Sequence, residues 1–351
     1  MSRIAVISGS RGALFEALDA ELSGRGWQAR WAPFGAAGRD DLAAAARGAE
    51  ALFHVGVRTP STLAVEERME IEAGAAYLAG RAALGAPVRR FVLLSTVSVY
   101  GRPRNLPCPE GDLKRPRSAF ERARWRAEQA AWTTFRQGAP LTVLRPALAY
   151  GPTLRGGPMR ALALAALFNA GRRRVPIIRR GPVAHLVHLR DVARAAAHVA
   201  ELPDDRSVVG RAFNVADDAP LPLAEHLAAA IEAMGHAPGR VLPYSPRLAA
   251  FFLGLVRSVP DRILLEPLNR WLAAAWRRLA ASTGTRPDLV PRLDREILHW
   301  MSADHYYDTR RLRDLGWSPA YPVSVDALPE TIRGLLDRRL LPGGPGALPD
   351  R

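Results

Sequence analysis

The sequence predicts an α/β protein in which a doubly wound parallel sheet is followed by a smaller, mainly helical lobe. Short apolar strands alternate with helices from Arg3 to Leu144, a pattern typical of a parallel sheet covered on both faces. The first strand runs directly into a glycine turn and a helix, and the chain is mostly helical from Pro220 onward. A chain of 351 residues is long enough for about two packed units.

Each strand is predicted from a short apolar run, and each helix from an apolar stripe or an alanine-rich stretch. The predicted strands are Arg3–Ser8, Trp27–Trp31, Glu50–Val57, Arg90–Thr96, Leu141–Leu144, His185–His188 and Arg211–Val215. The predicted helices carry the stripe of Leu14, Leu18 and Leu22 or span Asp40–Arg47, Glu66–Leu84, Phe120–Arg136, Met159–Asn169 and Leu328–Leu340, and Asp191 is expected to cap one more.

These elements predict a domain organisation in three parts. Residues 1–218 form the sheet domain, with 151–182 contributing to the second lobe. Residues 219–340 form the helical lobe, and the proline- and glycine-rich residues 341–351 form a flexible tail.

The composition is that of a globular chain with a large excess of basic charge. The formal net charge is +15, and Lys114 is the sole lysine among 49 basic residues, which indicates a compositional bias toward arginine. No zinc-finger spacing or RNA-binding aromatic motif accompanies the charge, so we expect no specific nucleic-acid partner. The N-terminus has no signal-peptide pattern, and Cys108 is the only cysteine; a cytoplasmic location is therefore expected.

Four segments downstream of the glycine turn sharpen the interpretation. They are Phe53-His-Val-Gly-Val, Leu94-Ser-Thr-Val-Ser-Val-Tyr-Gly101, Leu144-Arg-Pro-Ala-Leu-Ala-Tyr-Gly-Pro152 and Val187-His-Leu-Arg-Asp-Val-Ala193. Together with the turn, the chain resembles the extended short-chain dehydrogenase/reductases over roughly residues 3 to 335, in the epimerase/dehydratase and 3β-hydroxysteroid dehydrogenase-like branch. The resemblance implies a Rossmann-like domain that binds NAD or NADP and carries out hydride transfer.

The resemblance also implies catalytic positions, and one of them is changed. Thr96 stands where the family has the serine or threonine that holds the substrate oxygen, whereas Phe120 and Arg124 stand where it has the Tyr-x-x-x-Lys pair. Phe120 has no hydroxyl to move a proton, and Arg124 is a fixed cation because a guanidinium keeps its proton in proteins. General acid–base catalysis typically contributes about 10²–10⁴-fold, so the standard reaction loses a large share of its rate. Tyr150 is a further candidate for positioning or polarising a substrate.

The predicted cofactor site is altered as well. Gly9 and Gly12 keep two glycines of the loop, but Phe15 replaces the third, where a bulky ring should displace the helix or fill space near the pyrophosphate. The second strand ends without the usual acidic residue, and Arg11 and Arg30 are candidates to meet a 2′-phosphate of NADP or to face solvent.

The resemblance further places Val55, Arg124 and Pro146 against the cofactor. Only Gly35 to Glu50 separates the second strand from the next apolar strand, so the usual edge strand beside the adenine is expected to be missing. These departures indicate joint relaxation of the redox site, unless an alignment is shifted by a helical turn.

The stretch from Arg247 to Arg278 is rich in both arginine and large apolar residues. It allows three interpretations: a lid over an apolar substrate, a helix pair that contacts a membrane surface, or an ordinary amphipathic cover of the second lobe. No cluster with metal-ligand spacing is present in the sequence, so no metal is expected.

The favoured functional prediction is a divergent member of this superfamily that binds a hydrophobic small molecule. In it, Tyr/Lys hydride transfer is disabled or weakened and any chemistry is a non-redox isomerisation or cyclisation. The alternatives are a working NAD(P)H-dependent oxidoreductase of the 3β-hydroxysteroid type and a non-catalytic interaction protein. A homodimer and peripheral contact with the inner face of the membrane through residues 247–278 remain open as partner hypotheses.

Overall fold

The computed structural model describes residues 3–34, 38–59, 63–86, 88–294 and 300–344. The chain divides into two compact units. Unit 1 comprises Met1–Ala147, Leu189–Ala216 and Tyr307–Ala320, and unit 2 comprises Leu148–His188, Asp217–Tyr306 and Tyr321–Arg351. Each unit is therefore built from three separate segments of the chain.

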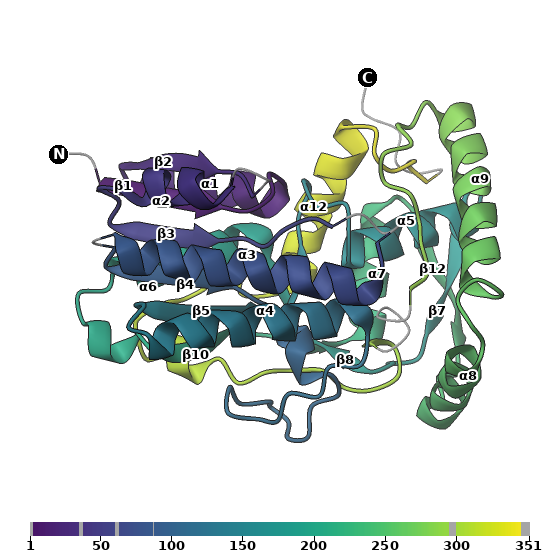
Figure 1. Ribbon diagram of the computed structural model, residues 1–351. Coiled ribbons are helices and arrows are strands. Elements are labelled where there is room, and N and C mark those ends of the chain that lie inside the picture. Colours follow the sequence, from purple (N-terminus) through teal and green to yellow (C-terminus); the bar gives the residue numbers. More distant parts are fainter. Residues whose placement is uncertain (1–2, 35–37, 60–62, 87, 295–299, 345–351) are drawn as a thin grey trace. The chain divides into compact units, whose positions relative to one another are not determined.

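Unit 1 is built around a six-stranded, fully parallel sheet (Figure 1). Its strands are β1 (Arg3–Ser8), β2 (Trp27–Ala32), β3 (Ala51–His54), β4 (Arg90–Leu94), β5 (Leu141–Pro146) and β10 (Arg211–Val215). Their order across the sheet is β10-β5-β4-β3-β1-β2. The order reverses between β1 and β3, which creates the crevice in which doubly wound sheets bind ligands. The predicted α/β fold is confirmed, and β2 is the edge strand of the sheet that the described residues form, as the short spacing after it predicts.

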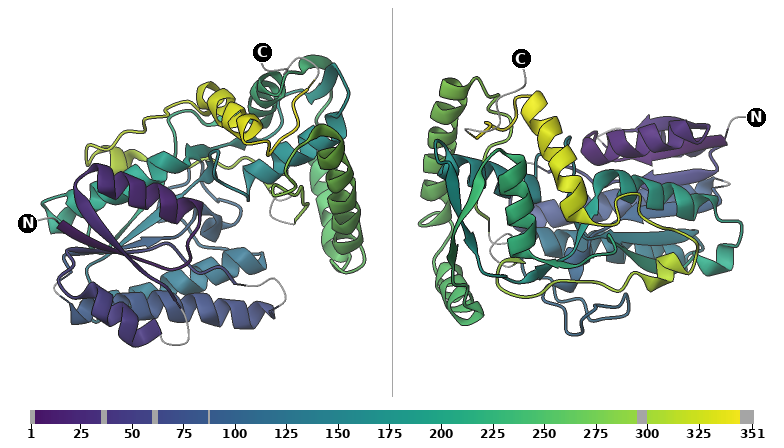
Figure 2. Two further views of the ribbon diagram at one scale, coloured as in Figure 1. Left: turned by 90° about the horizontal axis from the view of Figure 1, so that it is seen from above. Right: turned by 180° about the vertical axis from the view of Figure 1, so that it is seen from behind.

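Helices cover both faces of this sheet (Figure 2). They are α1 (Ala13–Gly24), α2 (Gly38–Ala46), α3 (Val65–Gly85), α4 (Ala119–Arg136), α6 (Leu189–Glu201) and the short α11 (Arg310–Arg313), with 3₁₀ turns η1 (Val97–Tyr100) and η2 (Asp205–Ser207). Helices α1 and α6 pack against each other on one side, and α3 packs along α4 on the other. The strands are buried on both faces, as their continuous apolar runs predict.

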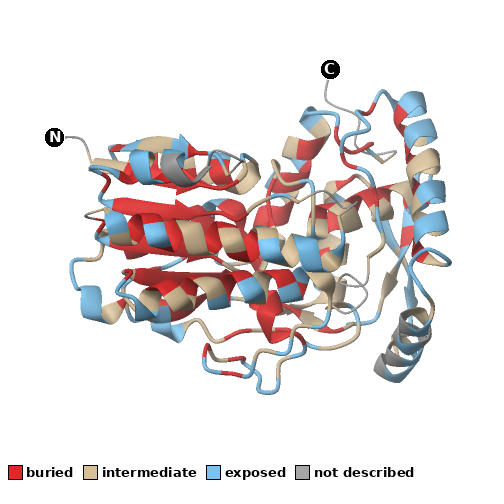
Figure 3. Cartoon of the chain, in the orientation of Figure 1, coloured by how far each residue is buried: buried red, intermediate tan, exposed pale blue. Residues whose placement is uncertain are grey.

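Unit 2 combines helices with three small two-stranded sheets. Its helices are α5 (Pro158–Asn169), α7 (Leu223–Ala233), α8 (Pro246–Ser258), α9 (Leu265–Thr283) and α12 (Ser324–Asp337). Its strands are β6 (Leu148–Tyr150), β7 (Arg174–Ile178), β8 (Val183–Ala184), β9 (Leu186–His188), β11 (Leu221–Pro222) and β12 (Ala237–Leu242). The core of this unit gathers around Trp276, Met159 and Leu335, and Figure 3 shows exposed residues along α9 and on the described part of α8.

Asp191 and Leu341 lie in settings that the local sequence pattern does not predict. Asp191 is not the N-cap of the alanine-rich helix, because α6 begins at Leu189 and Asp191 lies buried in its first turn. Its carboxylate instead accepts a hydrogen bond from the backbone N–H of Ala320 at 2.7 Å. The expected tail begins with a packed residue, since Leu341 is buried in unit 2, and residues 345–351 lie outside the described ranges.

No helix among the described residues is both long and apolar enough to cross a membrane.

Candidate functional site

Two glycines meet where the order of the sheet reverses. Gly9 follows β1 and Gly56 lies just beyond β3, and the N–H of Ser10 donates to the carbonyl of Gly56 at 3.0 Å. Gly9 has a φ of +116°, and a Cβ there would lie 2.3 Å from that carbonyl oxygen. Only glycine satisfies both conditions. The close contact holds the two strand ends together, with Val55 donating its N–H to Ser8.

Helix α1 begins four residues after Gly9. Gly12 is the N-cap residue, and no side chain caps the helix. The guanidinium of Arg58 lies beside Gly12, with Nη2 3.4 Å from where a Cβ would stand. Free N–H groups at a helix N-terminus and a nearby cation suit a phosphate group. The sequence did not single out Arg58, since one exposed arginine among so many gives no signal.

Aromatic side chains fill the space beside the end of β2. Phe15 is buried and meets Trp31 edge-on, with ring centroids 6.4 Å apart. The indole N–H of Trp31 donates to the carbonyl of Gly9 at 3.1 Å, and the Arg11 guanidinium lies 4.3 Å from the Trp31 ring. Phe15 thus makes an edge contact with Trp31. Arg30, the second arginine predicted for the cofactor site, donates a hydrogen bond to the carbonyl of Arg47.

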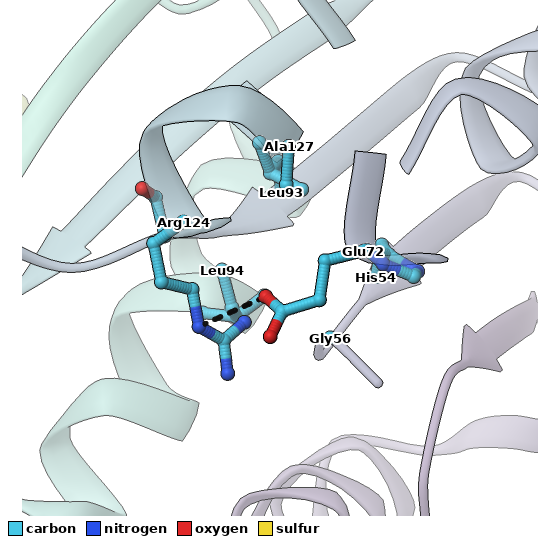
Figure 4. A pocket seen from close by; sticks show the side chains of 8 residues that line it. His54, Gly56, Glu72, Leu93, Leu94, Arg124 and Ala127 are labelled. Atoms are coloured by element: carbon cyan, nitrogen blue, oxygen red, sulfur yellow. Dashed lines mark ion pairs between the residues drawn. The ribbon is translucent and has the colours of Figure 1, made fainter. Parts of the chain in front are cut away.

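Arg124 projects from α4 over Gly56 (Figure 4). A Cβ on Gly56 would lie 2.2 Å from Nη1 of Arg124. The Nε atom of Arg124 lies 3.5 Å from a carboxylate oxygen of Glu72 on α3. Arg124, Glu72, His54 and Ser95 line a cavity of ≈ 10 Å³, which has room for about one water molecule. The guanidinium is therefore held across the crevice by a partner from another helix.

Burial shifts the pKa values of two groups that line this cavity, Glu72 and His54. Burial raises the pKa of Glu72, although the positive charges of Arg124 and Arg68 oppose the shift. Burial and then the charge of Arg124 lower the pKa of His54 to about 3. His54 is thus neutral at physiological pH, and its Nδ1 lies 2.9 Å from Ser8 Oγ.

Phe120 occupies the first turn of α4, one helical turn before Arg124. Its ring is 39% exposed, and the Arg124 guanidinium lies 5.3 Å from the ring centre. A capping box fixes this turn, because Ser118 and Glu121 each bond the other's backbone N–H. The capping box therefore fixes the backbone that carries the Phe120 ring.

Thr96 caps the 3₁₀ turn that follows β4. Its Oγ1 accepts from the Ser98 N–H at 3.2 Å and donates to the Ser98 hydroxyl at 3.1 Å. Thr96 is half-buried.

The remaining predicted residues lie on strands. Pro146 ends β5, opposite Val215. Tyr150 belongs to unit 2, where it is buried on β6 and its ring lies 5.2 Å from that of His188. Among the residues that the structure describes, no three metal-ligating side chains converge.

A buried polar network beneath α4 was missed by sequence reasoning. Ser95 Oγ donates to Glu128 at 2.8 Å, and Glu128 forms an ion pair with Arg145 of β5. Arg145 also donates to the hydroxyl of Tyr100 at 2.8 Å. Glu72 and Glu128 could have been found as acidic residues on alanine-rich helix faces, since both lie in register with buried alanines.

Comparison with known proteins places the chain in a family. The model of the NAD dependent epimerase/dehydratase family matches residues 38–216. The match covers half of the chain and begins after the glycine loop. A comparison with curated proteins finds no match.

Solved structures of similar fold cover nearly the whole chain. A short-chain dehydrogenase/reductase superfamily protein from Agrobacterium tumefaciens with bound NAD has 18% identity and a TM-score of 0.63, covering 96% of this chain and 98% of that one. UDP-N-acetylglucosamine 4-epimerase from Bacillus cereus has 15% identity and a TM-score of 0.64 over 100% and 99% of the two chains. A human epimerase family protein with NADPH has 16% identity and a TM-score of 0.61 over 94% and 99%. At these identities the likeness concerns the fold, and the family match carries the assignment: the chain belongs to the NAD-dependent epimerase/dehydratase family.

Proposed function

We propose that this protein is a divergent family member that binds a hydrophobic small molecule and in which tyrosine-driven hydride transfer is disabled or much weakened. The observation that carries the proposal is Phe120, whose phenyl ring lies beside the Arg124 guanidinium at the start of α4. A ring without a hydroxyl neither donates nor accepts a proton, so the acid–base step of the family reaction has no group at this position.

The residues of the crevice fit one part of a dinucleotide and not the others. Gly9, the uncapped start of α1 and Arg58 suit the pyrophosphate. At the adenosine end, a carboxylate usually holds the ribose. In this chain Trp31 stands at the end of β2 and donates a hydrogen bond to the carbonyl of Gly9. At the reacting end, Arg124 is paired with Glu72. These residues support a proposal without hydride transfer.

Two side chains remain for a non-redox reaction such as isomerisation or cyclisation. Arg124 supplies a fixed positive charge that polarises a carbonyl or stabilises a developing oxyanion. Thr96 supplies a hydroxyl that orients the same oxygen once the hydroxyl turns away from Ser98. The exposed ring of Phe120 offers an apolar contact, which supports a hydrophobic ligand. The role of Tyr150 stays a prediction.

A working NADP(H)-dependent oxidoreductase is the second candidate. The observation in its favour is the position of Arg11, whose guanidinium lies over Trp31 at the end of β2. A guanidinium at the end of the second strand could bind the 2′-phosphate of NADP. A non-catalytic interaction protein is the third candidate, and it predicts neither ligand binding nor turnover.

Titration of the purified protein with NADPH and NADH, followed by turnover with a ketosteroid, separates these candidates. We expect a panel of apolar ketones and alcohols to raise the unfolding temperature, because a ligand that binds the native state stabilises it. We expect no oxidation of NADPH in the presence of the ketones. Tight dinucleotide binding together with ketosteroid turnover would overturn the proposal.

A further inference from the structure

Helices α8 and α9 expose large apolar side chains. Phe251 is 68% exposed and Leu248 59% exposed on α8, and Ile263 is 62% exposed in the connection to α9. On α9, Trp271 is 52% exposed. Soluble proteins scatter single apolar side chains over their surface, whereas four large exposed ones within 24 residues make this segment a candidate binding surface.

An ordinary amphipathic cover does not explain Trp271. Helix α9 buries Leu265, Leu272, Trp276 and Ala280 against the core of unit 2. Trp271 lies outside that stripe, on a face shared with the exposed Arg270 and Arg278. The helix thus has one apolar stripe for its own core and an outward aromatic residue that the core does not use.

The same segment carries an excess of positive charge. Between Arg247 and Arg278 six arginines accompany only Asp261 and Glu266. Helices that lie at a bilayer surface combine apolar or aromatic side chains with arginines, which meet the phosphates of anionic lipids. The arrangement of apolar and basic side chains fits that chemistry and does not fit a neutral apolar groove in a partner protein.

We propose that α8 and α9 dock this protein peripherally on an anionic phospholipid surface. We call residues 246–278 the docking segment. Leu248, Phe251, Ile263 and Trp271 enter the boundary between head groups and acyl chains, and the arginines contact lipid phosphates. This binding does not depend on the chemistry proposed for the crevice, and it fails or succeeds separately from it.

Vesicle sedimentation tests the proposal with the full chain. The protein is mixed with vesicles of phosphatidylcholine alone and with vesicles that contain phosphatidylglycerol as well, each at low and at high salt. We expect binding to the anionic vesicles at low salt, much weaker binding to the neutral ones, and a loss of binding as salt screens the arginines.

Matched variants locate the contact. Phe251→Glu and Trp271→Glu should each lower the partition coefficient by about tenfold or more, as expected for losing one buried aromatic ring. Phe168→Glu is the control, because Phe168 on α5 is as exposed as Trp271, at 52%. Arg270→Gln with Arg278→Gln should lower binding about fivefold for each charge removed, whereas Arg122→Gln with Arg136→Gln on α4 of unit 1 should not.

Three results would overturn the proposal. The first is no sedimentation with anionic vesicles. The second is an equal loss of binding in the docking-segment variants and their controls, which would indicate attraction by net charge alone. The third is a change of oligomeric mass in Phe251→Glu without vesicles, which would assign the segment to a second copy of the chain. Circular dichroism and unfolding curves check that each variant is folded.

Discussion

At the scale of single residues, the crevice differs from the family pattern by the exchange of two side chains. The family pattern leads one to expect a tyrosine next to a lysine, whereas this chain has Phe120 next to Arg124, and Arg124 is paired with Glu72 from another helix. The sequence predicted the exchange at Phe120 and Arg124, because both follow from aligned motifs. It did not predict the pairing, because Glu72 and Arg124 are far apart along the chain and meet only when α3 packs on α4.

Glu72 should cost stability when it is charged. Its folded-state pKa is raised by burial, so the folded protein binds the proton more tightly than the unfolded chain, and stability is lost as pH rises through the raised pKa. We predict that Glu72→Gln is at least as stable as the wild type at pH 7, with an advantage that shrinks on acidification. Urea unfolding at a series of pH values measures this. A Glu72→Gln variant that is markedly less stable at pH 7 would show that the ion pair outweighs the burial.

His54 should have the opposite pH dependence. Its pKa falls from 6.5 to about 3 on folding, so the unfolded chain binds protons more readily between those values and stability is lost as pH falls from 6.5 towards 3. We predict that His54→Asn, which retains a polar atom near Ser8, flattens this part of the stability profile. The slope is the measurement, because the smaller side chain lowers stability equally at every pH. An unchanged slope would mean that other groups cause the acid sensitivity.

At the scale of elements, the contact between α3 and α4 positions the site. A Cβ on Gly80 of α3 would lie 2.0 Å from Oγ1 and 2.7 Å from Cβ of Thr134 on α4. The absence of a side chain at Gly80 lets the helices approach closely, and this approach brings Glu72 within reach of Arg124.

Two glycines of α3 offer a matched comparison. We predict that Gly80→Ala destabilises the protein by about 1–3 kcal/mol through overpacking, and that Thr134→Ala in the same chain relieves much of the loss. Gly74→Ala should instead stabilise by up to about 1 kcal/mol, because nothing lies within 4 Å of its Cβ position and alanine favours a helix. Chemical unfolding of the three variants gives the values. Equal effects of Gly80→Ala and Gly74→Ala would contradict this account of the packing.

Element boundaries and caps show where sequence reasoning works. The buried strands and the long helices α3 and α4 were predicted to within a few residues, because their patterns are local and continuous. The cap expected at Asp191 was wrong, since the tertiary contact with Ala320 uses that carboxylate inside the helix. Such a long-range partner leaves no mark in the local pattern.

At the scale of the whole molecule, the class of fold was predicted from the sequence. Alternating strands and helices predicted the parallel sheet, and the short spacing after β2 predicted that β2 is its edge strand, as it is among the described residues. Leu189–Ala216 lies in unit 1 and within the range 1–218 expected for the sheet domain, and Tyr307–Ala320 joins unit 1 through packing between segments distant in sequence. The compositional excess of arginine also hid individual functional candidates such as Arg58.

The measurement that tests the central claim most directly compares hydride transfer by the wild type with that by the double variant Phe120→Tyr, Arg124→Lys. The oxidation of NADPH is followed by absorbance with a panel of ketones. We predict that the wild type stays at background and that the double variant is faster, by up to the roughly 10²–10⁴-fold typical of a positioned acid. Wild-type turnover as fast as that of the double variant would contradict the account, because the missing tyrosine hydroxyl would then not limit hydride transfer.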